Sequence, residues 1–146
     1  MMLENEVDEV EEFDLVFNFE ITKTMGYQNF EELEVWKKAR ILKNKVFDLV
    51  KQFPAVEKFR LTDQIIRSSR SVATQIAEGH GRRSFPDRIR YCIISRGSLS
   101  ETLNHFIDAS DCNYITEEQM LFYRNLIEEL ERLLNGYINY LEKNIK

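Results

Sequence analysis

The amino-acid sequence predicts an all-α protein that folds as an antiparallel up-down-up-down four-helix bundle with a non-helical N-terminal extension. Three observations support this prediction. Apolar residues recur at spacings of three and four in four separate stretches, which is the period of a helix with one buried face. The 146 residues include only 5 Gly and 2 Pro, so few tight turns can form. The stretches are joined by roughly two to ten residues, and such short connections make successive helices antiparallel.

The first predicted helix runs from about Glu31 to Lys51. Pro54 ends it, because proline disfavours helical conformation at the residue before it. Trp36 and Phe47 widen its apolar stripe. That stripe consists of Val35, Ala39, Leu42, Val46, Leu49 and Phe53.

The second predicted helix begins near Thr62, a good N-cap, and ends at Gly79, because glycine readily takes the left-handed conformation after a helix. Its inner face is rich in small residues, so we expect the backbone of another helix to come close to it. This face comprises Ile65, Ser69, Val72, Ala73, Ile76 and Ala77.

The third predicted helix starts at Ser84 and stops around Asn113. Pro86 lies in its first turn and Asp87 takes the capping-box position. Its expected inner face comprises Ile89, Cys92, Ile93, Leu99, Leu103, Phe106, Ile107 and Ser110.

The fourth predicted helix follows Thr116, with Gln119 placed to complete a capping box. It has a strong heptad-like apolar stripe. The stripe consists of Tyr123, Leu126, Ile127, Leu130, Leu133, Leu134, Tyr137 and Leu141.

Two residues are unusual for the third helix. Gly97 lies in its middle, where glycine costs about 1 kcal/mol relative to alanine, so we expect close helix packing there against Ser68 or Ser69. Arg96 falls within the apolar arc, which predicts a partly buried guanidinium in a structural ion pair. An arginine that faces a ligand is the alternative. The candidate carboxylates for the ion pair are Glu101, Glu128 and Glu131.

The chain divides into an acidic extension, residues 1–29, and a helical part, residues 30–146. Within 1–24, eight acidic residues and one lysine give a charge of −7. Phe13, Leu15, Phe17, Phe19 and Ile21 alternate with other residues there, which is a strand-like period. Three interpretations stay open: a disordered tail, a segment laid along the surface, and a strand that pairs with a partner's sheet.

Positive charge is concentrated in the middle of the chain. Residues 58–96 contain nine basic and three acidic residues, a charge of +6, although the whole chain has a net charge of −5. Arginine suits phosphate because its planar fork bonds two oxygens at once. The alternative is that these arginines only form a solvated charged surface. If nucleic acid binds elsewhere, the next candidate residues are Lys37, Lys38 and Lys45. The predicted nucleic-acid-binding residues are Arg67, Arg70, Arg82, Arg83, Arg88 and Arg90.

No catalytic residues, cofactor site or metal site are predicted. His105, Asp108 and Cys112 lie on neighbouring turns, but structural zinc sites normally have four ligands at tighter spacing. The chain contains no phosphate loop and no nucleophile elbow. We therefore expect a protein that is not an enzyme. The absence of an apolar run of about 18 residues, and an acidic N-terminus, predict a cytoplasmic protein with no membrane contact.

Several segments resemble a known family, the bacterial four-helix-bundle proteins first noticed as products of intervening sequences in large-subunit ribosomal RNA genes. They are "FEELEVWKKA" at 30–39, "FP" at 53–54, "LTDQIIRSSRSVATQIAEGHGR" at 61–82 and "SRGSLSE" at 95–101. The resemblance covers roughly residues 30–143. The family's usual pattern starts near Phe30, so the acidic extension departs from it, and Met25 is a second candidate start.

The resemblance implies a four-helix bundle and a ring-shaped homopentamer. It also implies kinship with the accessory protein of diversity-generating retroelements, which binds nucleic acid and a reverse transcriptase. The expected function is that of a nucleic-acid-associated accessory or scaffold protein, with RNA and DNA both open as ligands. The alternative is a protein-interaction module with no nucleic-acid role, in which residues 1–24 contact the partner.

Overall fold

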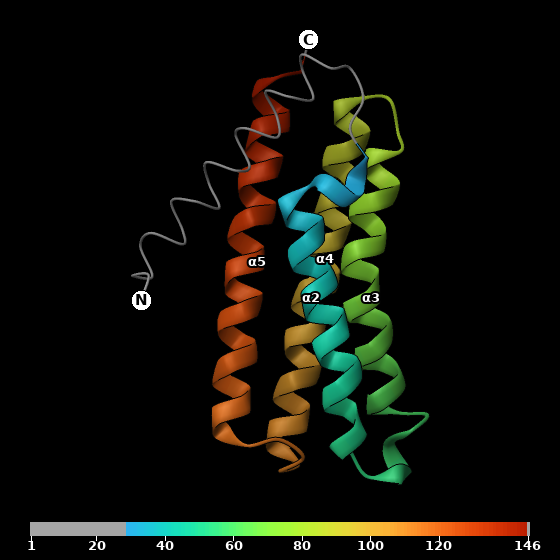
Figure 1. Ribbon diagram of the computed structural model, residues 1–146, viewed down its shortest axis with the longest axis vertical. Helices are drawn as coiled ribbons and strands as arrows, with labels where there is room; N and C mark the ends of the chain where they lie inside the picture. Colours follow the sequence, from blue (N-terminus) through green and yellow to red (C-terminus); the bar gives the residue numbers. More distant parts are fainter. Residues whose placement is uncertain (1–28, 146) are drawn as a thin grey trace.

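The computed structural model describes residues 29–145, which form four long α-helices packed side by side (Figure 1). Successive helices run in opposite directions, so the predicted up-down-up-down bundle is confirmed. The strand-like pattern predicted at 13–21 lies outside the described residues. The long helices are α2 (Glu34–Leu49), α3 (Leu61–His80), α4 (Phe85–Asp111) and α5 (Glu117–Lys143). Three short 3-10 helices accompany them: η1 (Phe30–Glu32), η2 (Val50–Gln52) and η3 (Ala55–Glu57).

Each long helix packs against its neighbours in the sequence, and α2 also contacts α5, which closes the bundle. The core contains the predicted stripes of α2, α3 and α5 almost unchanged. Tyr137 and Phe106 are the largest side chains that are fully buried. Within residues 29–145, none of the helices is both long and apolar enough to cross a bilayer.

The inner face of α4 differs from the predicted one. Ile93 and Ile107 are exposed, by 46% and 36%, although the apolar pattern placed them inside. Ser95 and Thr102 are fully buried instead, because their hydroxyls are hydrogen-bonded across the contact with α3. The buried residues of α4 are Cys92, Ser95, Leu99, Thr102, His105, Phe106 and Ala109.

Two of the predicted helix starts are confirmed by their caps. The Ser84 hydroxyl accepts a hydrogen bond from the backbone N–H of Asp87 at 3.3 Å. Thr116 and Gln119 form a reciprocal capping box with both hydrogen bonds at 3.0 Å. These contacts satisfy amide groups that would otherwise lack partners in the first turn of α4 and α5.

The ends of α3 differ from the predicted ones. The helix starts at Leu61, one residue before Thr62, and the Glu57 carboxylate accepts a hydrogen bond from the Leu61 N–H at 3.0 Å. It continues through Gly79 to His80, and Gly81 keeps a right-handed backbone with φ −69°. A side chain from the preceding 3-10 helix therefore replaces the expected cap, and no left-handed glycine ends the helix.

The most extensive helix contact joins α3 and α4. The Ser95 hydroxyl donates to the carbonyl of Val72 at 2.7 Å, and the hydroxyls of Thr102 and Ser68 lie 2.8 Å apart. The predicted close approach of another helix to the small-residue face of α3 is therefore confirmed, and the approaching helix is α4. Ser69 is 1% exposed and belongs to this packed face.

The glycine at this contact is Gly79 and not Gly97. A Cβ added at Gly79 would lie 2.7 Å from the Cβ of Tyr91, closer than real atoms come. Apart from its own stretch of helix backbone, a Cβ at Gly97 would meet no atom of residues 29–145 within 4 Å, and Gly97 is exposed. The prediction that Gly97 marks close packing is wrong within one chain, because its position on α4 points away from α3.

Candidate nucleic-acid interface

The six predicted arginines form two groups. Four of them lie at one end of the bundle, in the α3–α4 connection and the first turns of α4, and we call this group the arginine end. It comprises Arg82, Arg83, Arg88 and Arg90. Arg67 and Arg70 lie on α3, about 20 Å farther along the helix axis at 1.5 Å per residue. The six predicted arginines are therefore spread over about 20 Å of the bundle in two groups.

Two of the arginines at this end are held by neighbouring side chains. Arg82 donates to the Tyr91 hydroxyl at 2.7 Å, and its guanidinium lies 3.4 Å from the Glu78 carboxylate. Arg90 pairs with Asp87 at 2.7 Å. Such exposed pairs contribute little to stability, since water and salt screen them. Their main effect is to orient the two guanidinium groups.

The other two arginines have no carboxylate partner among the described residues. The Arg88 guanidinium lies 5.3 Å from the centre of the Phe85 ring, and its Nε donates weakly to the carbonyl of Arg82 at 3.4 Å. Arg83 is exposed and makes no ion pair, hydrogen bond or ring contact within residues 29–145. Four cationic groups thus meet two carboxylates, which leaves positive charge at this end.

Arg67 and Arg70 have different surroundings. Arg67 is 78% exposed and pairs with Asp63 at 3.2 Å, one turn earlier on α3. The Arg70 guanidinium lies 5.8 Å from the centre of the Phe47 ring, which belongs to α2. The apolar pattern placed Phe47 in the inner stripe of α2, but its side chain is 50% exposed.

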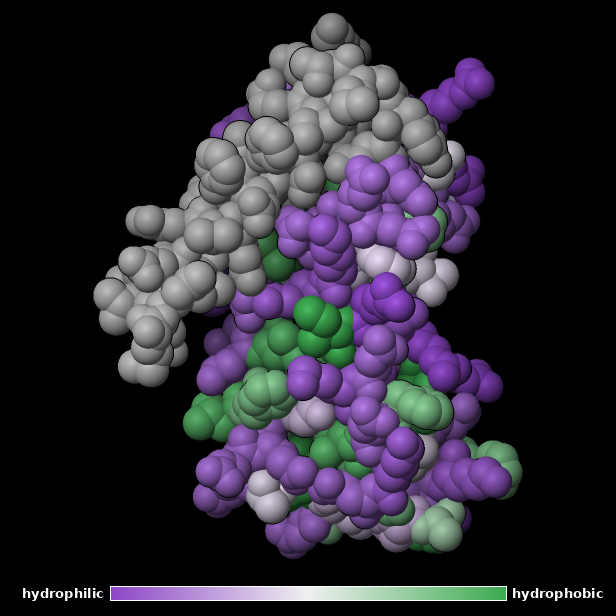
Figure 2. Space-filling view, in the orientation of Figure 1, coloured by the Kyte–Doolittle hydropathy of each residue, from purple (hydrophilic) through white to green (hydrophobic). Residues whose placement is uncertain are grey.

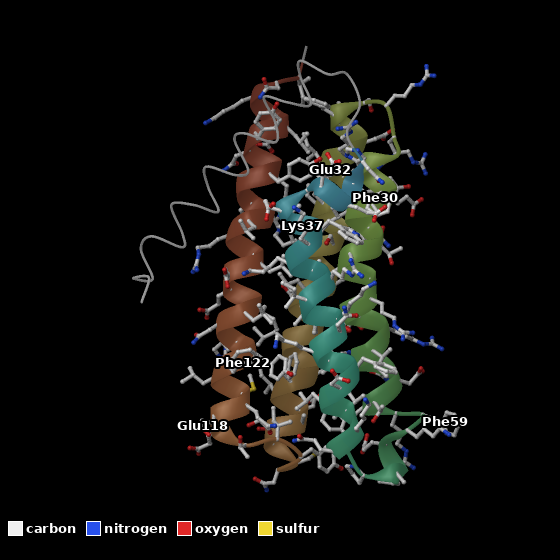
Figure 3. All side chains as sticks on the ribbon, in the orientation of Figure 1. Phe30, Glu32, Lys37, Phe59, Glu118 and Phe122 are labelled. Atoms are coloured by element: carbon white, nitrogen blue, oxygen red, sulfur yellow. The ribbon has the colours of Figure 1, made fainter. Side chains whose placement is uncertain are left out.

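Each strongly exposed phenylalanine of the described chain lies beside a cation. Lys58 is 5.3 Å from the ring of Phe59, and Lys45 is 5.3 Å from the ring of Phe122. Figure 3 shows Phe59 and Phe122 on opposite sides of the same half of the bundle. The contact between Lys45 and Phe122 could not be predicted from the sequence, because the two residues come from different helices.

A model of the family described as 23S rRNA-intervening sequence protein matches residues 31–136, which is most of the chain. The chain belongs to this family. The resemblance predicted from the sequence is therefore confirmed.

A solved structure is also similar to this family member. It is the crystal structure of a protein of unknown function from the S23 ribosomal protein family of Bacteroides thetaiotaomicron. The two share 27% sequence identity with a TM-score of 0.67, over 72% of this chain and 95% of that chain. No curated protein matches the chain at a significant level.

In this intervening-sequence family member, Arg96 has a different partner from the predicted one. Its side chain is half-buried, and its Nη1 donates to the amide oxygen of Asn135 on α5 at 2.8 Å. No ion pair joins it to a carboxylate within residues 29–145, so the predicted ion pair with Glu101, Glu128 or Glu131 is wrong. Asn135 is one turn beyond Glu131, and a neutral amide satisfies the guanidinium at this level of the bundle.

Replacing Arg96 with alanine is expected to lower the free energy of unfolding by about 1 kcal/mol. The effect is small because Asn135 is half-buried, so water can reach the amide that loses its partner. A buried charge pair would instead cost about 3 kcal/mol or more. Urea denaturation measures the difference, with Arg132→Ala on the exposed surface of α5 as control. Equal midpoints for the two variants would contradict the prediction.

The histidine and cysteine side chains of this protein do not gather. His105 is buried and its Nε2 lies 3.4 Å from the Glu101 carboxylate. Burial raises the pKa of the Cys92 thiol to about 12, so it stays protonated at neutral pH, whereas Cys112 is exposed. Over residues 29–145, no three side chains of metal-binding type come together.

Proposed function

We propose that this member of the 23S rRNA-intervening sequence protein family is a non-enzymatic, oligomeric accessory or scaffold protein that associates with nucleic acid. The observation that supports this most is the arginine end, where Arg83 has no partner among residues 29–145 and three further arginines lie within seven residues of it in the sequence.

The chemistry of this end favours phosphate. An exposed guanidinium offers parallel N–H donors that match two phosphate oxygens, and Arg83 can do so without first breaking an internal contact. Phosphate contacts give no base information, so the expected binding is independent of sequence. Positive charge on an otherwise acidic chain makes that binding sensitive to salt.

A double variant tests this proposal. Arg82→Ala/Arg83→Ala is expected to weaken binding of labelled RNA or DNA at low salt, because two phosphate-binding groups are removed. On single strands, the slope of log affinity against log salt should fall by about 0.7 for every phosphate that the variant no longer neutralises. Fluorescence anisotropy over a salt series measures both the affinity and the slope.

The matched control is Arg124→Ala/Arg132→Ala on α5, which removes the same charge from another part of the bundle. Deleting residues 1–24 removes a charge of −7 and should tighten binding if these residues compete with phosphate. Equal weakening by the two double variants would show a general charge effect and contradict a site at the arginine end. No binding of any nucleic acid at low salt would contradict the proposed function.

The proposed oligomer is supported by the outer face of α4. A row of uncharged residues at spacings of four and three lies exposed along this helix, and we call it the α4 stripe. Gly97 in its middle has free space around it, which a helix of another subunit could fill closely. The stripe comprises Ile93, Gly97, Ser100, Asn104 and Ile107.

We expect a homopentamer, which for chains of 17.4 kDa has a mass of about 87 kDa. Light scattering at micromolar concentration measures this mass. Ile93→Glu/Ile107→Glu should reduce it, since buried carboxylates without partners oppose association, whereas Val56→Glu at the end of the bundle should not. A monomer mass for the unmodified chain would contradict the pentamer.

A protein-interaction module without a nucleic-acid role is the second candidate. The α4 stripe favours it, because an uncharged helix face could equally receive a helix of a different protein. A monomeric chain that binds no nucleic acid would favour this candidate over the first.

A further inference from the structure

Aromatic and basic side chains are interspersed along the face of α2 and η2 that borders α3. Their spacings of four, three, four and four residues place them on one face of the helix. We call this set the α2 row. It consists of Trp36, Arg40, Lys43, Phe47 and Lys51.

Each aromatic member of the α2 row has at least one cation beside its ring. The Arg40 guanidinium lies 5.7 Å from the centre of the Trp36 ring. Phe47 has two such neighbours, Lys51 at 5.6 Å and Arg70 of α3 at 5.8 Å. Half of the Phe47 side chain is exposed, so its ring contributes less to the core than a buried phenylalanine and is open to a ligand.

A shallow hollow lies beside the row, between α2 and α3. Its volume is about 470 Å³, and Trp36 and Lys43 line it on the α2 side. On the α3 side the lining includes Ala73 and Ala77, whose short side chains leave the space open. A flat ring placed there would meet an aromatic side chain and an ammonium group together.

Few acidic groups oppose this surface. Asp48 pairs with Lys51 at 3.0 Å, and Glu78, at the edge of the hollow, is 3.4 Å from Arg82. Arg40 and Lys43 have no carboxylate partner in the described part of the chain. Figure 2 shows the face that α2 presents, where apolar residues are interspersed with hydrophilic ones below the grey atoms.

We propose that the α2 row, together with Arg70, binds single-stranded nucleic acid, with a base stacked on Phe47 and phosphates held by Arg40, Lys43 and Arg70. This inference rests on the proposed function and adds the strand class and a second site, separate from the arginine end. Stacking on an aromatic ring requires an unpaired base whose face is free, and a duplex does not offer one. Trp36 and Phe47 are about 16 Å apart along the helix, enough for several successive nucleotides to lie between them.

The experiment compares a labelled single-stranded oligonucleotide of mixed sequence with the blunt duplex of the same sequence, using the full-length chain at low salt. Phe47→Leu keeps an apolar side chain and removes the aromatic face. It is expected to weaken single-strand binding about fivefold or more, since stacking contributes about 1–3 kcal/mol per base, and to leave duplex binding unchanged. Phe122→Leu is the matched control, because Phe122 is 49% exposed on α5 and should leave both affinities unchanged.

The outcomes separate this site from the proposed function. Unchanged single-strand binding by Phe47→Leu, with weaker binding by Arg82→Ala/Arg83→Ala, would overturn the α2 row and keep the proposed function. Weaker binding by Phe47→Leu together with a changed light-scattering mass would assign Phe47 to a subunit contact and also overturn it. No binding of either strand form by the unmodified chain would overturn both.

Discussion

Replacing Phe106 with alanine is expected to lower the free energy of unfolding by about 3–5 kcal/mol. Phe106 is fully buried on α4, and its ring stacks on Tyr123 of α5 with centroids 4.5 Å apart. The substitution removes this stacking and leaves a cavity between α4 and α5. Urea denaturation followed by circular dichroism measures the decrease.

The control is Phe59→Ala, which makes the same change at a side chain that is 84% exposed. Its effect should stay within about 0.5 kcal/mol, because the core keeps nearly all of its apolar surface. Similar midpoints for the two variants would show that α4 does not turn Phe106 into the core.

Replacing Gly79 with alanine is expected to destabilise the protein by about 1–3 kcal/mol, although the same change inside a helix normally stabilises it. The added Cβ would lie 2.7 Å from the Cβ of Tyr91 and 3.4 Å from the backbone of Arg88. Neither contact is the flexible end of a side chain, so α3 and α4 must move apart. Thermal unfolding measures the effect as a lower Tm.

Gly81→Ala is the matched control two residues later. A Cβ there has ordinary contacts of 3.4 Å or more, and the backbone is right-handed. It should leave the Tm unchanged or raise it slightly, because alanine restricts the unfolded chain more than glycine does. A Tm for Gly79→Ala at or above that of the unmodified protein would contradict the close approach of the two helices.

The fold was predictable because helical period and cap chemistry are local properties of the sequence. Ser84 and Thr116 begin helices through contacts that span three residues, and the stripe of α5 needs only its own heptads. The start of α3 was not predictable in this way, because Glu57 caps it from a separate 3-10 helix.

The inner face of α4 shows where apolar pattern alone fails. Ser95 and Thr102 can be buried because their hydroxyls donate hydrogen bonds to acceptors on α3. Those acceptors are known only once the two helices are paired. With two polar residues inside, Ile93 and Ile107 lie on the outer surface. The apolar pattern therefore predicted the position of the helix correctly but assigned some residues of its buried face wrongly.

The candidate site was predictable in part for the same reason. Arg82 and Arg83 are neighbours in the sequence and remain so in the fold, so the arginine end followed directly from the sequence. The contact of Arg70 with Phe47 joins residues from two helices and depends on the rotation of each. Charge counted along the chain cannot give such a pairing.

The order of the helices also bears on how the chain reaches this structure. Neighbours in the sequence are neighbours in the bundle, so most contacts have low contact order and can form hairpin by hairpin. The contact between α2 and α5 is the exception, since it joins the two ends of the described chain. Its formation has the largest entropic cost of loop closure, because all of α3 and α4 lies between the two helices. We therefore expect the α3–α4 hairpin to form early and the docking of α2 on α5 to complete folding.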